Sequence, residues 1–257
     1  MDLYNARLDV ICDGLRLAAG AWMPPEPKGI VVFLHGMPSA ALPAPGVAGY
    51  PDLAREWAGY GWVAVWADLR SVRESPGFFS IEGWVRDAAA VIEAARGIEG
   101  AAELPLAVVA TSAGGAVGTE AIRRGAPVSA LVLLAAPAEW VGFAPNPEAA
   151  VERAVDGSGL SLAPDVVADP TLWAAEFQGV ATERSIAELR IPVLIIHGTA
   201  DAVIPAAHAR RIADRSPGAE LWVIEGAEHN LRHDRELMVR VGEWLTRGLG
   251  RRDPGAS

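Results

Sequence analysis

Short apolar runs alternate with stretches of helical spacing from about residue 30 to the end of the chain. The apolar runs are nearly continuous and rich in β-branched residues, which is typical of strands buried on both faces of a parallel sheet. The stretches between them have the apolar spacing of amphipathic helices and mostly end at glycine. The expected strands are residues 29–36, 61–70, 105–112, 128–137, 191–198 and 219–226. The expected helices are residues 51–61, 81–97, 113–125, 205–215 and 235–249.

The alternation of strand and helix predicts an α/β fold with a mostly parallel, doubly wound sheet and right-handed crossovers. The first part of the chain has a different pattern. Residues 6–24 contain two alternating runs on either side of Asp13 and Gly14, a dipeptide typical of tight hairpin turns. We therefore expect an N-terminal antiparallel hairpin at the edge of the sheet.

A long segment between two expected strands breaks this rhythm. From residue 138 to about residue 190 the chain contains four prolines and only short helical patches. Insertions of this length are usually functional or disordered, and four large aromatic residues argue against disorder here. These residues are Trp140, Phe143, Trp173 and Phe177. We expect one domain over residues 1–257, with a small cap at about residues 138–190 over one edge of the sheet.

Composition limits the class of protein and its partners. Of the 257 residues, 51% are hydrophobic and 21% are charged, which is enough for a substantial core. The net charge is −10 and Lys28 is the only lysine, which argues against a nucleic-acid or anionic-membrane partner, because both need clustered cations. The only cysteine, Cys12, excludes an internal disulfide and a cysteine-based metal site.

The chain also shows no sign of an export or membrane segment. Residues 1–20 carry several charges and no uninterrupted apolar core, unlike a signal peptide. The longest apolar runs, such as residues 130–138, are too short to span a bilayer. We expect a cytoplasmic protein, and the sequence leaves its oligomeric state open.

Polar residues with catalytic potential follow four of the expected strands. They are His35, Ser112, Asp201 and His229. Ligands of an open parallel sheet bind beyond the carboxyl ends of its strands, so these side chains can share one site. Taken alone, Ser112 fits two interpretations. It can be the polar end of a strand before a loop, or a catalytic serine on a sharp turn into a helix.

Four motifs in chain order favour the second interpretation. They are HG at 35–36, ATSAG at 110–114, HGTADAVIP at 197–205 and GAEHNL at 226–231. Through them the chain resembles the α/β-hydrolase family, in particular its small serine esterases and related peptidases. The resemblance covers nearly the whole chain, and the order Ser, Asp, His is the family's order. It implies the α/β-hydrolase fold.

The serine motif departs from the family pattern G-x-S-x-G at one position. Ala110 stands where the family usually has its first glycine. Alanine is only one methyl larger, so the departure leaves the nucleophile in place. Gly114 and Gly115 supply the clearance on the helix side.

The resemblance implies a role for each of these residues. Ser112 is the expected nucleophile, and His229 is the base that accepts its proton and returns it to the leaving group. Asp201 is the acid that orients the imidazole of His229. The backbone N–H groups of Met37 and Ala113 are the expected oxyanion hole. The resemblance implies no cofactor.

Each assignment has an alternative. Asp201 can be a turn or helix-capping residue, and His229 can be a surface histidine of a polar loop. His233 competes with His229, but it lies among charged residues at the start of the last expected helix. Glu225 and Glu228 are acids that lie too close in sequence to His229 to match the family's layout.

The remaining histidines have supporting interpretations. His35 is expected to hydrogen-bond the loop that shapes the oxyanion hole, and a contact with substrate is kept open as well. His197 and His208 are interpreted as structural or surface residues. No spacing of His, Asp or Glu resembles a metal site, and the chain has no phosphate-binding loop of the G-x-x-x-x-G-K type.

Residues 68–80 contain a second departure from the family. Many relatives carry a more glycine-rich sequence there, and Ser71 and Arg73 replace two of the expected glycines. This loop can border the site, so the bulky and charged Arg73 is a reason to keep a non-catalytic interpretation open. Arg73 can instead pair with an acid of the cap.

The predicted cap is strongly acidic, since residues 138–188 contain nine acidic residues against two arginines and have a local formal charge of −7. Such a cap would repel anionic substrates and tolerate neutral or cationic ones, although a solvated acidic surface explains the charge equally well. Its aromatic residues either wall an apolar acyl or alcohol pocket or form the cap's own core. They are Trp140, Phe143, Trp173 and Phe177.

The leading functional hypothesis is a serine hydrolase that cleaves a carboxylic ester through an acyl-enzyme intermediate. A second hypothesis keeps the Ser-His-Asp triad for an amidase, a peptidase, or an acyl transferase or cyclase, acting on a small molecule or short peptide. A third is a non-catalytic binding protein on the same fold, because a fold alone does not determine function.

Overall fold

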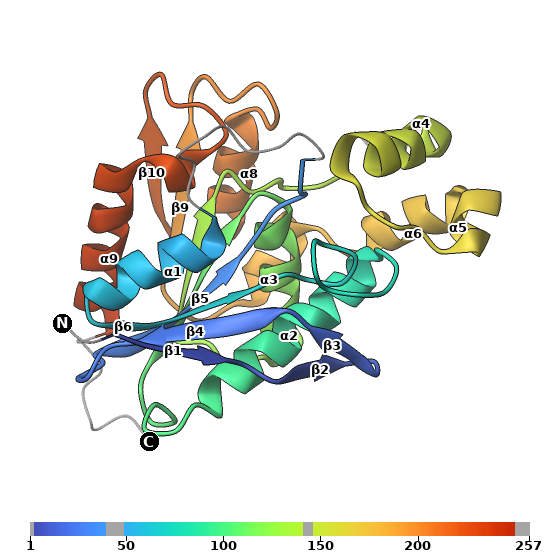
Figure 1. The fold of residues 1–257 in the computed structure, drawn as a ribbon. Coiled ribbons are helices and arrows are strands. Elements are labelled where there is room, and N and C mark those ends of the chain that lie inside the picture. The colour runs from blue at the N-terminus through green and yellow to red at the C-terminus, as the bar shows by residue number, and fades with distance from the viewer. Residues whose placement is uncertain (1–2, 40–48, 141–145, 250–257) are drawn as a thin grey trace.

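A twisted sheet with helices on both faces forms the body of the protein (Figure 1). The computed structural model describes residues 3–39, 49–140 and 146–249. The main sheet has eight strands in the order β1-β4-β6-β5-β7-β8-β9-β10. The strands from β6 to β10 in this order, β5 included, are parallel to one another. Strand β4 is antiparallel to both of its neighbours, β1 and β6. The strands are β1 (Tyr4–Arg7), β4 (Ala19–Met23), β5 (Gly29–Leu34), β6 (Trp62–Ala67), β7 (Leu106–Thr111), β8 (Ala130–Leu134), β9 (Val193–Gly198) and β10 (Glu220–Ile224).

The central strands explain the continuous apolar runs. Every residue of β5, β7, β8 and β9 is buried, because helices cover both faces of the sheet. Alternate residues of one strand therefore enter two separate cores. Val32 of β5 packs in the core under α2, α3 and α8, whereas Phe33 packs in the core under α1 and α9. The helices are α1 (Tyr50–Gly59), α2 (Ile81–Arg96), α3 (Ala113–Arg123), α8 (Ala207–Arg215) and α9 (Arg235–Leu249). The predicted α/β architecture is confirmed.

The predicted N-terminal antiparallel hairpin is confirmed, and its outer arms, rather than its tip, form the edge of the main sheet. β2 (Val10–Cys12) and β3 (Leu15–Leu17) pair around a turn at Asp13, whose φ is 51°. They make a separate two-stranded sheet, and β1 and β4 form the antiparallel edge of the main sheet. Ion pairs of Asp13 with Arg70 and with Arg86 of α2, both at 2.8 Å, hold the hairpin against that helix.

Between β8 and β9 the chain leaves the sheet and forms a series of short helices. We call residues 146–188 the cap segment. Figure 1 shows its first helices, α4 to α6, to one side of the sheet. Its elements are α4 (Pro147–Glu152), η1 (Arg153–Gly157), α5 (Pro164–Ala168), α6 (Thr171–Gly179), α7 (Thr182–Ser185) and η2 (Ile186–Glu188).

Polar contacts fasten the cap segment to the body of the protein. At its far end, the Ser185 hydroxyl donates to the carboxylate of Glu120 on α3 at 2.6 Å. On α6, the Glu176 carboxylate accepts a hydrogen bond from Ser80, the residue before α2, at 2.7 Å. The cap segment is therefore attached both to α3, which begins directly after Ser112, and to the start of α2. Within the part of the chain that the structure describes, no helix is long and apolar enough to cross a membrane.

Candidate active site

Ser112 lies at a sharp turn between β7 and α3. Its φ of 52° and ψ of −124° are unusual for a residue with a side chain, and such strain persists only where the surroundings hold it. Here the Ser112 N–H donates to the carbonyl of Leu134 on β8, and the Ser112 carbonyl accepts from the N–H of Gly115, both at 2.8 Å. The strand therefore stops at Ser112 and presents its hydroxyl at the carboxyl edge of the sheet.

Three glycines make this turn sterically possible. A Cβ on Gly114 would lie 2.4 Å from the His35 carbonyl oxygen, and one on Gly115 would lie 2.6 Å from the Cβ of Ala136. A Cβ on Gly36 would lie 2.8 Å from the Cβ of Ser112 itself. The loops after β5 and β8 can approach Ser112 and the start of α3 only because these Cβ atoms are missing.

Asp201 and His229 meet beyond the ends of β9 and β10. The Nδ1 of His229 lies 2.7 Å from the Oδ2 of Asp201. The other carboxylate oxygen, Oδ1, accepts hydrogen bonds from the N–H groups of Val203 and Ile204, both at 2.8 Å. Asp201 thus organises a turn and binds the imidazole of His229 at the same time. Its side chain is fully buried, whereas that of His229 is 16% exposed and reaches the surface of the site.

A second histidine contacts the same carboxylate. His197, at the end of β9, is fully buried, and its Nε2 lies 3.1 Å from Asp201 Oδ2 and 2.8 Å from the carbonyl oxygen of Ile204. Its Nδ1 has no hydrogen-bond partner among the described residues. Sequence reasoning interpreted His197 as structural or surface and missed this contact. The available signal was its position four residues before Asp201, at the end of the same strand.

Ser112 and His229 line one cavity of about 900 Å³. Met37 and Ala113 line it too, so the two expected oxyanion-hole residues lie beside the serine. Ala113 is the first residue of α3, and the N–H of a first helical residue has no partner inside its own helix. The structure thus brings the three predicted triad residues and the two expected oxyanion-hole residues together, with Asp201 behind His229. This arrangement can combine a nucleophile, a base and donors for a developing negative charge.

Comparison with known proteins assigns the family. The family described as serine aminopeptidase, S33, matches residues 25–159 and 173–236. The chain belongs to this family. A monoacylglycerol lipase of Mycolicibacterium smegmatis is 27% identical over 92% of this chain and 95% of its own length. The expected membership of the α/β-hydrolase superfamily is therefore confirmed, and the chain is a member of a hydrolase family.

Solved structures agree on the fold of this S33 family member. Est1E from Butyrivibrio proteoclasticus with ferulic acid bound superposes with a TM-score of 0.70 at 20% identity, covering 94% of this chain and 99% of its own. An esterase of Pyrococcus furiosus gives a TM-score of 0.70 at 17% identity, covering 97% and 93% of the two chains. At such identities the likeness establishes the α/β-hydrolase fold alone.

His35 is a buried backbone-bonding residue in this S33 family member. Its Nδ1 lies 2.7 Å from the Gly36 carbonyl oxygen, and its Nε2 accepts a hydrogen bond from the Leu69 N–H at 2.9 Å. The pKa of His35 is lowered from 6.5 to about 4, chiefly by burial and in part by the nearby charges of Arg73 and Arg232. The neutral ring therefore joins the loop after β5 to the loop after β6, and it is not among the residues that line the cavity.

The predicted pocket aromatics divide into two groups. Trp140 lines the cavity. Trp173 and Phe177 are 1% exposed and pack against Phe79, with ring centroids 5.5 and 6.1 Å from it, so they belong to the core rather than to the cavity wall. Phe143 lies outside the described residues.

Two residues of the loop after β6 adopt backbone conformations that favour glycine. Ser71 has a φ of 66° and Arg73 a φ of 47°, both in the left-handed region that favours glycine. The suggested pairing of Arg73 with a cap acid is wrong. Its guanidinium binds Asp68 of the same loop, with N–O distances of 2.6 and 3.1 Å, because the left-handed turn folds the chain back on itself.

Three cavity residues with ionisable side chains were not predicted as site residues. They are Glu139, Arg153 and His208. Two of the cap acids counted in the sequence are offset by a base outside the cap, since Glu139 and Glu183 both bind Arg211 of α8, at 2.6 and 2.8 Å. The charge facing the cavity is consequently less negative than composition suggests. Within the described residues, no group of His, Cys, Asp and Glu could hold a metal ion.

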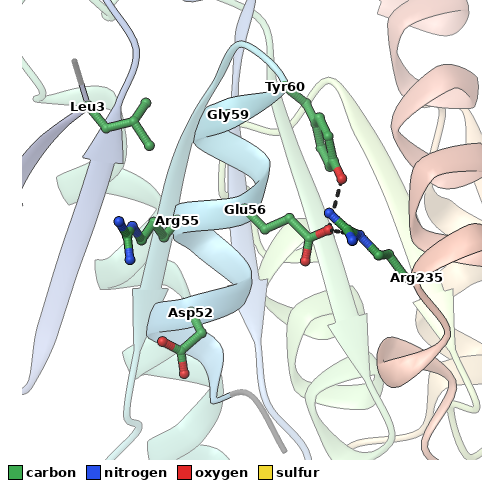
Figure 2. A pocket seen from close by; sticks show the side chains of 7 residues that line it. All are labelled: Leu3, Asp52, Arg55, Glu56, Gly59, Tyr60 and Arg235. Atoms are coloured by element: carbon green, nitrogen blue, oxygen red, sulfur yellow. Dashed lines mark hydrogen bonds and ion pairs between the residues drawn. The ribbon is translucent and has the colours of Figure 1, made fainter. Parts of the chain in front are cut away.

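A second hollow lies on the surface beside α1 and the start of α9 (Figure 2). It has a volume of about 600 Å³ and contains neither Ser112 nor His229. Its Glu56 carboxylate accepts hydrogen bonds from the Tyr60 hydroxyl at 2.8 Å and from Arg235 at 2.7 Å. These groups satisfy one another, so this hollow offers no nucleophile and no comparable chemistry.

Proposed function

We propose that this protein is a serine hydrolase that cleaves carboxylic esters, with Ser112, His229 and Asp201 as its catalytic triad. The observation that carries the proposal is the 2.7 Å contact between His229 and Asp201 at a cavity that also holds the strained Ser112. The monoacylglycerol lipase and the Pyrococcus furiosus esterase named above support ester substrates.

The proposed reaction begins with attack of Ser112 Oγ on the ester carbonyl carbon. His229, whose Nδ1–H is held by Asp201, accepts the serine proton on Nε2. The N–H groups of Met37 and Ala113 stabilise the negative oxygen of the tetrahedral intermediate. Collapse breaks the bond to the alcohol, which takes the proton from His229 and leaves Ser112 acylated.

Water completes the proposed cycle. His229 takes a proton from a water molecule that attacks the acyl-enzyme carbonyl, and the carboxylic acid leaves as Ser112 recovers its proton. Asp201 stays ionised throughout, because its role is to orient and stabilise the imidazolium. A cavity of about 900 Å³ with a largely apolar wall suits a small-molecule ester.

The direct test is hydrolysis of p-nitrophenyl esters of increasing acyl length, together with labelling by a fluorophosphonate and mass mapping of the adduct. The adduct is expected on Ser112, and Ser112→Ala and His229→Ala are each expected to lower turnover by up to a millionfold. His233→Ala is the matched control, because this exposed histidine lies four residues from His229. A Ser112→Ala variant with a tenth of the wild-type rate would remove this serine from the mechanism.

The description of the matched family favours a second candidate, hydrolysis of amides or peptides by the same triad. Both reactions pass through an acyl-enzyme, so the triad alone does not separate them. Comparing kcat/KM for an aminoacyl p-nitroanilide and for the p-nitrophenyl ester of the same acyl group separates the two. The ratio of kcat/KM for the ester to kcat/KM for the anilide is expected to exceed the ratio of their uncatalysed hydrolysis rates.

A further inference from the structure

His208 is a hydrogen-bond donor of fixed orientation in the cavity. It is the second residue of α8, and its side chain lines the same cavity as Ser112. Its Nδ1 accepts a hydrogen bond from the Ala138 N–H at 3.0 Å. An imidazole nitrogen that accepts a hydrogen bond carries no proton, so the ring proton is on Nε2. Burial, and after it the charge of Arg211, lowers the pKa of His208, so the ring is neutral at neutral pH.

Glu139 is an acceptor beside this donor. It follows Ala138 directly and lines the same cavity. The hydrogen bond from Arg211 lowers the pKa of Glu139, so its carboxylate is ionised. Arg211 contacts the Oε1 of Glu139 at 2.6 Å and also binds Glu183, which keeps the carboxylate in place and offsets its charge.

Apart from Arg153 and Ser158, the neighbouring wall of the cavity is apolar. Trp140, Ala154, Val203, Ile204 and Pro205 line it. A donor and an acceptor that line the same cavity select a group that can both accept and donate a hydrogen bond. A substrate carboxylate would face the ionised Glu139, and an ammonium group would face the ring N–H of His208 and the positive charge of Arg211. A neutral hydroxyl satisfies both residues.

We propose that Glu139 and His208 bind a hydroxyl group of the substrate, so that the preferred substrates are neutral esters with a free hydroxyl in addition to the ester group. The His208 Nε2–H donates to this hydroxyl oxygen, and the hydroxyl donates to the Glu139 carboxylate. This inference rests on the proposed esterase function and makes it more specific. It selects the neutral class from the neutral or cationic substrates expected for the acidic cap.

Matched pairs of esters test the proposal on the wild-type protein. One pair carries the difference in the alcohol, 2-hydroxyethyl butanoate against propyl butanoate, and the other in the acyl chain, p-nitrophenyl 6-hydroxyhexanoate against p-nitrophenyl heptanoate. In each pair a methyl group replaces the hydroxyl. In at least one pair the hydroxyl ester is expected to have about tenfold higher kcat/KM, the effect of one well-placed hydrogen bond. Equal values in both pairs would overturn the proposal.

Variants then locate the preference. His208→Asn keeps a side-chain oxygen for the Ala138 N–H and lacks the Nε2–H donor, and Glu139→Gln keeps the shape of the acceptor without its charge. In both, the ratio between the hydroxyl and methyl esters is expected to fall towards one. Glu148→Gln, at an exposed acid of α4, is the control and is expected to keep the wild-type ratio. A wild-type ratio between the hydroxyl and methyl esters in both His208→Asn and Glu139→Gln would contradict the assignment.

The two proposals fail in different ways. Hydrolysis of p-nitrophenyl butanoate by the wild type, and labelling of Ser112, depend only on the esterase proposal. If both succeed and neither pair shows a preference, the hydroxyl subsite alone is wrong. If neither occurs, the esterase proposal is wrong, and the hydroxyl subsite falls with it. Thermal melting of each variant shows whether it is folded, and Glu139→Gln provides the test should His208→Asn not fold.

Discussion

The side chain of Ser71 and the main chain of Ser161 hydrogen-bond to each other in both directions. Ser71 Oγ donates to the Ser161 carbonyl oxygen at 3.1 Å and accepts from the Ser161 N–H at 2.7 Å. The same carbonyl also accepts from the Phe79 N–H at 2.7 Å. A hydroxyl can donate and accept at once, so one small side chain joins the loop after β6 to the cap segment. The residue that replaces an expected glycine thus has a structural role.

Substitutions at Ser71 separate this role from backbone strain. Ser71→Ala keeps the left-handed φ of 66° and removes both hydrogen bonds, so the free energy of unfolding is expected to fall by about 1–2 kcal/mol. Ser71→Gly removes the same bonds and relieves the strain, so it is expected to be about 1 kcal/mol more stable than Ser71→Ala. Urea denaturation measures both. An alanine variant as stable as the wild type would show that the bonds contribute nothing.

The elements that could be predicted are those that depend on local pattern. β5 and β7 to β9 are apolar throughout because both faces are covered, and this is visible as continuous runs. Ser112 comes directly after β7, and Asp201 and His229 follow β9 and β10 by a few residues. Parallel strands end at one edge of a sheet, so the topology alone predicts that these residues approach one another.

The features that could not be predicted depend on how loops fold back. Arg73 binds Asp68 because of a left-handed turn that its own residue type disfavours. His197 contacts Asp201 because the turn after β9 brings the carboxylate back over the end of the strand. Trp173 is buried against Phe79 of a distant loop, and no spacing in the sequence shows that contact. Partner choice of this kind is set by tertiary geometry.

Gly114→Ala is expected to remove activity and to destabilise the fold. The new Cβ would lie 2.4 and 2.6 Å from the carbonyl oxygens of His35 and Leu34, which are backbone atoms and cannot rotate away. α3 would have to move away from β5, and Ser112 would move with it. The expected loss is about 3 kcal/mol of stability and at least a hundredfold in kcat/KM. Urea denaturation and p-nitrophenyl ester hydrolysis measure the two effects.

Gly248→Ala is the matched control for this substitution. Gly248 also lies in a helix, α9, and a Cβ there would meet nothing within 4 Å. Alanine has the higher helix propensity, so a small gain of up to about 1 kcal/mol is expected with unchanged activity. If Gly114→Ala behaved like this control, the close approach of α3 to β5 would not be needed.

His197 is expected to act as a positioning residue for Asp201. Its Nε2–H is shared between the Ile204 carbonyl and the Oδ2 of Asp201, the oxygen that also binds His229. His197→Leu removes this donor and is expected to lower kcat by about tenfold or more with KM little changed, because substrate contacts stay in place. His197→Gln retains a terminal N–H group in a similar place and is expected to restore part of the rate. Equal losses in both variants would indicate a packing role alone.

The neutral, buried His35 is expected to make stability depend on pH. Its pKa is lowered from 6.5 to about 4, chiefly by burial and then by the nearby charges of Arg73 and Arg232. As pH falls through 6.5, the unfolded chain binds a proton at this histidine while the folded protein does not. The free energy of unfolding therefore decreases as pH falls, and the decrease continues until about pH 4. His35 is expected to contribute a loss of about 2 kcal/mol between pH 7.5 and pH 5.

Urea denaturation at pH 7.5 and pH 5 tests this expectation against two variants. His35→Gln cannot titrate, so it is expected to be less stable than the wild type at pH 7.5 but to lose about 2 kcal/mol less on acidification. His233→Gln is the control. The exposed His233 lies outside the loops that His35 joins, and only partial burial lowers its pKa, so most of the wild-type slope is expected to be kept. A His35→Gln protein with the full wild-type slope would show that the pH dependence arises at other groups.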